Sequence, residues 1–130
     1  MNLFNNYKSG TVISVPKPPF THFGILVFNF LGEPFVISNS FRKEKVVIET
    51  LEKFCSGYKP KTHNMWGKYT RQQIVERAKS LLGTPYSAAK YNCEHFVRDV
   101  HGLSVESPQF NNIFGLALVS GISYFLLKKS

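Results

Sequence analysis

The chain has 130 residues and a mass of 14.8 kDa, which suffices for one domain with a single core but not for two. Hydrophobic residues make up 43% and charged residues 18%, so a disordered or fibrous protein is excluded. Sixteen Lys and Arg against eight Asp and Glu give a net charge of +8, which favours anionic partners.

The basic residues form no run of five or six, and no helix-turn-helix, zinc-finger or RNP signature is present. The excess charge therefore indicates first a solvated surface, then attraction to an anionic membrane, and nucleic acid last. The opening residues 1–4 lack the pattern of a signal peptide, so we expect a cytoplasmic, reducing setting in which Cys55 and Cys93 are thiols. Histidines and cysteines lack paired ligand spacing, so no metal or other cofactor is predicted.

The first half of the chain predicts short strands joined by tight turns, as in an antiparallel meander. The β-branched first run is expected to stop at Pro16, and residues 16–19 are expected to form a stiff extended linker because each proline fixes φ and removes a donor. A helical turn is expected over residues 50–54. The predicted strands cover residues 11–15, 20–30, 35–38 and, as a fourth, 46–48.

Two longer helices are predicted after residue 70. Thr70 and Gln73 fit a capping box, apolar residues recur at helical spacing, and Gly83 suits a left-handed C-cap, which predicts a helix over residues 71–82. A second helix is expected to open at Asn92, a favoured N-cap, and to end at Gly102. Together these elements predict an α+β fold with an antiparallel sheet packed against helices.

Cys93 is the candidate nucleophile. If Asn92 caps the helix, the thiol lies in the first turn, where backbone N–H groups and the helix dipole favour a thiolate. Such a thiol also needs an imidazole base on a rigid element. His22 on a predicted strand is favoured over His95, which is two residues from the thiol on the same helix, because side chains at i and i+2 do not face each other.

The remaining histidines, His63 in irregular chain and His101 near a helix end, are weaker candidates for the base. From spacing alone, a buried hydrophobic role for the cysteine and a structural role for the strand histidine are the commoner outcomes. Glu94 and His95 are expected to serve the helix terminus and the framework rather than the chemistry.

Residues 92–96, Asn-Cys-Glu-His-Phe, resemble the NCEHF signature of the lecithin:retinol acyltransferase-like family. The surrounding segments 10–16, 21–27, 77–86 and 107–109 are similar to the strands, helix and S-x-Q stretch of that family. The likeness spans residues 9–110, and it implies a permuted NlpC/P60 papain-like fold.

The resemblance implies that Cys93 accepts an acyl group as a thioester and that His22 is the general base. In the family's animal members the substrates are glycerophospholipids, and the activities are phospholipase A and acyltransferase. The family's second histidine, which orients the base, aligns with Ser38 here. Asn39 could replace it only if the strand bulges, because alternation points it to the other face.

Two alternatives to an active lipid enzyme stay open, and the serine at position 38 favours the first of them. One is a weakened or inactive interaction protein, like the H-box/NC proteins of some picornaviruses, and the other is an NlpC/P60-like peptidase. We expect residues 1–110 to form the domain and residues 111–130 a hydrophobic tail. Residues 113–127 carry no charge and, with the basic surface, predict membrane association through the C-terminal segment.

Overall fold

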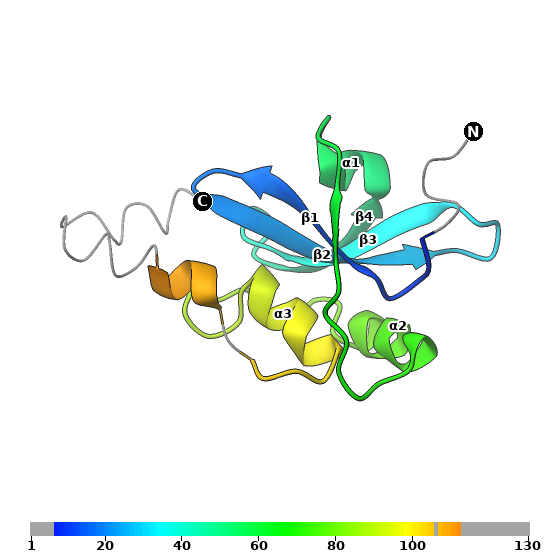
Figure 1. The fold of residues 1–130 in the computed structure, drawn as a ribbon. Coiled ribbons are helices and arrows are strands. Elements are labelled where there is room, and N and C mark those ends of the chain that lie inside the picture. Colours follow the sequence, from blue (N-terminus) through cyan, green and yellow to red (C-terminus); the bar gives the residue numbers. More distant parts are fainter. Residues whose placement is uncertain (1–6, 106, 113–130) are drawn as a thin grey trace.

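The computed structural model describes residues 7–105 and 107–112, so the predicted tail over 113–127 lies outside the described residues. A five-stranded antiparallel sheet forms the centre of the molecule, with α1 against one face and α2 and α3 against the other (Figure 1). This is the predicted α+β arrangement. Within the described ranges, no helix combines the length and the apolar character needed to cross a bilayer.

The elements follow the chain in a simple order. The strands are β1 Val12–Lys17, β2 Phe20–Phe28, β3 Pro34–Ser40, β4 Lys45–Thr50 and β5 Lys61–His63; the helices are α1 Leu51–Cys55, α2 Arg71–Ser80 and α3 Cys93–Val100. A further helical turn covers 108–112. The four predicted strands and three predicted helices are all present.

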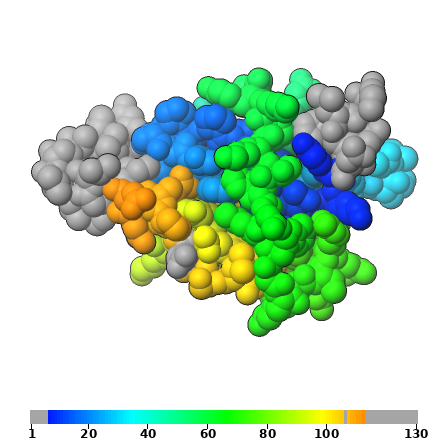
Figure 2. Space-filling model, viewed as in Figure 1, coloured from blue at the N-terminus to red at the C-terminus, as the bar shows by residue number. Residues whose placement is uncertain are grey.

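The sheet has the order β4-β3-β2-β1-β5, and every neighbouring pair is antiparallel. The first four strands form the predicted meander. Strand β5 was not predicted, because it is three residues long and lies in chain without periodicity. It pairs with β1 only over 12–14, and the segment that carries it runs along the β1 edge from α1 to α2 (Figure 2).

The prediction that the first strand stops at Pro16 is wrong. Strand β1 continues through Pro16 to Lys17, and the expected linker is a tight turn into β2. The reason is that β5 reaches only as far as Ser14, so β1 has a free edge at Pro16. A proline on a free edge removes no hydrogen bond from the sheet.

Side-chain alternation divides the core into two clusters, one on each face of the sheet. Phe23 and Ile25 of β2 pack with α2 and α3, whereas Leu26 packs with α1. Residues 22 and 26 are four positions apart on β2, so their side chains point to the same face of the sheet. Strand β2 therefore directs the His22 side chain to the α1 face and Phe23 to the α3 face.

Local capping defines both longer helices. Thr70 and Gln73 form the predicted capping box of α2, and Gly83 follows with φ of +90°. Helix α2 ends at Ser80, two residues before its predicted end. Asn92 is the N-cap of α3, as predicted, and Gly102, with φ of +74°, follows its C-cap.

Candidate active site

The N-terminus of α3 is held by a reciprocal capping box. The Asn92 Oδ1 accepts hydrogen bonds from the backbone N–H groups of Glu94 and His95, at 2.9 and 3.0 Å. In return, the Asn92 N–H donates to the His95 Nδ1 at 3.0 Å. Histidine thus takes the place that Glu or Gln has in the usual box, and His95 has the framework role that the sequence predicted.

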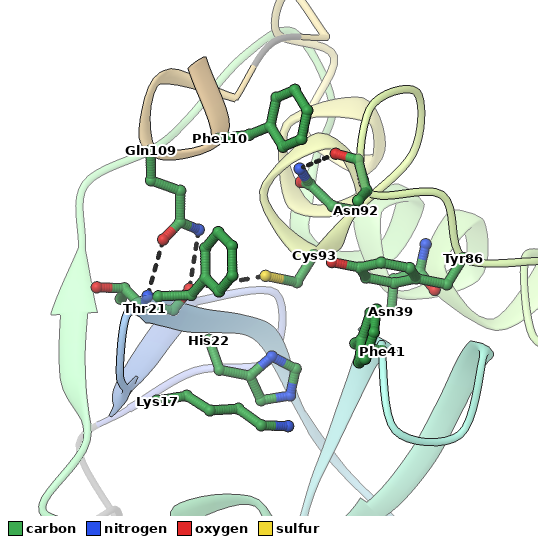
Figure 3. Close-up of a pocket in the computed structure, with 12 residues that line it drawn as sticks. Lys17, Thr21, His22, Asn39, Phe41, Tyr86, Asn92, Cys93, Gln109 and Phe110 are labelled. Atoms are coloured by element: carbon green, nitrogen blue, oxygen red, sulfur yellow. Dashed lines mark hydrogen bonds between the residues drawn. The ribbon is translucent and has the colours of Figure 1, made fainter. Parts of the chain in front are cut away.

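Cys93 is the first residue of α3 and is 7% exposed. Its Sγ donates to the Thr21 carbonyl at 3.7 Å (Figure 3). Among the described residues no hydrogen bond joins this sulfur to His22, although both side chains line one pocket. We call this cavity the Cys93 pocket. It is also lined by Lys17, Phe20, Thr21, Asn39, Phe41, Tyr86, Ala88, Asn92, Gln109 and Phe110.

The Cys93 pocket is small. Its volume is about 30 Å³, which is the share of one water molecule in the liquid. Aromatic rings make up much of the wall, and Phe41 meets Tyr86 edge to face with centroids 5.3 Å apart. The pocket as it stands has no room for a bulky acyl chain.

His22 lies on β2 with its ring against α1. The ring stacks on Phe54 with centroids 4.9 Å apart and an interplanar angle of 28°. The His22 Nε2 is 3.4 Å from the Ser38 Oγ, so the serine reaches the ring at the long limit of a hydrogen bond. Gly24 makes room for this arrangement, since a Cβ there would collide with Val36 and lie 2.9 Å from the Phe54 ring.

Ser38 and Asn39 lie on opposite faces of β3, and the strand has no bulge, because the register with β4 runs on through both residues. Asn39 is fully buried and lines the Cys93 pocket. Its Nδ2 donates to the Tyr91 carbonyl at 2.7 Å. Its Oδ1 is buried and has no hydrogen-bond partner within the part of the chain that the structure describes. Asn39 therefore does not share the face of the imidazole.

The electrostatics of the site contradict the expectation that the N-terminus of α3 favours a thiolate at Cys93. Burial raises the pKa of the Cys93 thiol to about 11, although the backbone N–H groups of Phe23 and Glu94 act in the opposite direction. Burial, together with the Lys17 ammonium, lowers the pKa of His22 to about 3. The helix N-terminus does not outweigh the loss of solvation. At neutral pH the site holds a neutral thiol and a neutral imidazole.

The other histidines have hydrogen bonds away from the pocket. The Nε2 of His63 is 2.6 Å from the Ser14 Oγ, and His63 belongs to β5 rather than to irregular chain. The His101 Nε2 is 2.7 Å from the Gly10 carbonyl, and His101 is fully buried. Of the histidines in the described ranges, His22 is the one that lines the Cys93 pocket.

Gln109 is a site residue that the sequence did not single out. Its Oε1 accepts from the Thr21 N–H at 2.7 Å, and its Nε2 donates to the Thr21 carbonyl at 2.9 Å (Figure 3). Glu94 anchors the same turn, accepting from the Ser107 hydroxyl at 2.8 Å. The S-x-Q stretch was the available signal. Its two polar side chains fasten the 107–112 turn to α3 and β2.

Comparison with known proteins assigns this arrangement to a family. The sequence model of the family described as Lecithin retinol acyltransferase matches residues 5–103, which is most of the chain. The chain belongs to this family. No curated protein matches it. Membership in the lecithin retinol acyltransferase family indicates an enzyme of the acyltransferase or phospholipase type.

Proposed function

We propose that this protein transfers an acyl group from a glycerophospholipid through a thioester on Cys93, with His22 as the general base. The observation that carries the proposal is that the two side chains line one pocket at the N-terminus of α3 in a member of this family. A thiol and an imidazole that can exchange a proton are the minimal set for nucleophilic acyl transfer.

The reaction proceeds in two balanced halves. The sulfur of Cys93 attacks the ester carbonyl and forms a C–S bond, while the thiol proton passes to His22. The C–O bond to the glycerol then breaks, and His22 returns the proton to the departing alcohol. Water or another acceptor next attacks the thioester, loses its proton to His22, and the sulfur leaves and is reprotonated.

The neutral state of both groups determines how the proton moves. Burial raises the pKa of Cys93 to about 11 and lowers that of His22 to about 3, so both shifts disfavour the charged forms of the two groups. A preformed thiolate–imidazolium pair is therefore disfavoured in the described structure. We propose that the thiol proton is transferred to His22 as the sulfur attacks.

Ser38 takes the place of the group that orients the base. Its hydroxyl accepts from or donates to the His22 Nε2 at 3.4 Å but supplies no charge. An orienting group without charge lowers the rate and leaves the chemistry in place. We propose that Ser38 is a weak positioning residue.

A catalytically silent interaction protein is the second candidate. The raised pKa of Cys93, the lowered pKa of His22 and the small pocket favour it. The two candidates share the fold and differ in turnover. A peptidase has no comparable support in the described structure.

Phosphatidylcholine vesicles with a radiolabelled acyl chain test the proposal. The full chain should release labelled fatty acid or transfer it to an acceptor, and Cys93→Ala should abolish both. Cys55→Ala is the matched control, because it also removes one buried thiol, and it should keep the activity. If the unaltered protein forms no more product than Cys93→Ala, the result would instead support the interaction protein. Sedimentation of the same vesicles tests the predicted membrane association.

A further inference from the structure

A second cavity lies on the α1 side of the sheet, where β1, β4 and α1 meet. Its volume is about 330 Å³, roughly ten times that of the Cys93 pocket. Four cationic side chains line it, and we call it the basic cleft. The four are Lys17, Arg42, Lys43 and Lys53.

Within the described residues, the positive charges of the basic cleft exceed the negative ones. Glu49 is its one acidic lining residue, so the cleft has three positive charges in excess. The salt bridge found in the described part of the chain joins Arg77 to Asp99 and involves none of the four cations. Like charges gathered around a hollow repel one another, and burial and Arg42 both lower the pKa of Lys17.

The basic cleft borders the candidate active site through His22, which lines both cavities. The Lys17 side chain runs beside the His22 ring (Figure 3), and Lys17 also lines both cavities. A group bound in the basic cleft would therefore lie next to the proposed base.

We propose that the basic cleft binds a phosphate group beside His22. The four cations project from β1, from the turn after β3 and from α1, so they can meet oxygens that point in several directions, as those of a tetrahedral phosphate do. A planar carboxylate would use fewer of them.

Binding of phosphate would also act on the base. The Lys17 charge is one of the two causes that lower the pKa of His22. A bound anion offsets that charge and makes the imidazole a stronger base. The binding itself does not depend on acyl transfer, because Cys93 lies outside the basic cleft.

The experiment is a titration of the full chain followed by the NMR resonances of the His22 ring. One arm adds inorganic phosphate, and a second adds a short-chain phosphatidylcholine below its micelle concentration. Acetate at equal ionic strength is the anion control. The same titrations are run on Cys93→Ala, so that binding is measured where acyl transfer is impossible.

Three charge-matched variants decide which residues bind. Arg42→Gln and Lys53→Gln each remove one exposed cation of the basic cleft, and each should weaken binding roughly tenfold. Lys79→Gln removes an exposed cation of α2, across the sheet, and should have no effect.

The outcomes separate the source of the phosphate. If both probes shift the His22 resonances, the basic cleft binds a phosphate group from either source. If only inorganic phosphate shifts them, the ligand is free phosphate; if only phosphatidylcholine does, it is the lipid headgroup. The proposal is overturned if neither probe moves the His22 resonances, if acetate moves them equally, or if Lys79→Gln weakens binding as much as Arg42→Gln. Binding without turnover would leave the basic cleft standing and reject the acyl-transfer function.

Discussion

The ionisation of Cys93 is the property on which the chemistry depends most directly. Replacing Cys55 with alanine leaves Cys93 as the one thiol of the 130-residue sequence, and pH then becomes the perturbation. Burial opposes the thiolate, whereas the N-terminus of α3 favours it. A helix terminus contributes about 0.3–1 kcal/mol, and up to about 2 kcal/mol in partly buried sites.

The size of the effect follows from the two pKa values. The pKa of a thiol, ordinarily 9.0, is raised here to about 11, which disfavours the thiolate by roughly 3 kcal/mol. At about pH 8 the folded protein should contain about a hundredfold less thiolate than an unperturbed cysteine. Cys93 is therefore expected to be a slow nucleophile towards small reagents despite its position at the helix terminus.

Alkylation by iodoacetamide measures this directly. The logarithm of the rate should rise linearly with pH up to about pH 10 without levelling off. The same protein in urea should level off near the ordinary thiol pKa. Restricted access would lower the rate at every pH but leave the shape of the profile unchanged. A folded-state plateau at or below about pH 8.5 would refute the argument that burial controls this thiol.

Four further outcomes are expected. Phe110→Ala, which opens the wall of the pocket, should speed alkylation of Cys93 and move its midpoint to lower pH, because it relieves part of the burial that raises the pKa, and should cost about 3–5 kcal/mol in urea unfolding. Gln109→Ala should cost about 1–3 kcal/mol in the same assay, because it removes both hydrogen bonds to β2. The pKa of His22 is 6.5 in the unfolded chain and about 3 in the folded chain, so the folded protein loses stability as the pH falls below 6.5. His22→Gln lacks this titration. Between about pH 7 and pH 5 it should therefore lose about 2 kcal/mol less unfolding free energy than the unaltered protein. Ser38→His should raise turnover of phosphatidylcholine, whereas Ser38→Ala should change it little, because the existing contact is 3.4 Å long; equal rates in both variants would show that position 38 does not orient the base.

Features that depend on neighbouring residues could be predicted from the sequence. The capping boxes that begin α2 and α3 are bonds between side chains and backbone three residues apart, so Thr70 and Asn92 could be recognised directly. Strand alternation was equally local. It placed Ser38 and Asn39 on opposite faces, and the sheet register then brings Ser38 to the face of His22.

Features set by distant parts of the chain could not be predicted. Strand β5 and the tolerance of Pro16 both depend on how far one segment extends along the edge of another. The bonds from Gln109 to Thr21 span 88 residues. The high pKa of Cys93 has the same origin, because the motif reveals the helix terminus but not the side chains that close over it.

The absence of a side chain at Gly24 has a consequence for the base. The space it leaves on the strand is filled by Val36 and by the Phe54 ring, and that ring is the surface on which His22 lies. An alanine at position 24 would displace Val36 and Phe54, and with Phe54 the surface against which the imidazole stacks. The orientation of the proposed base thus depends on Gly24, a buried residue two positions along β2 from His22.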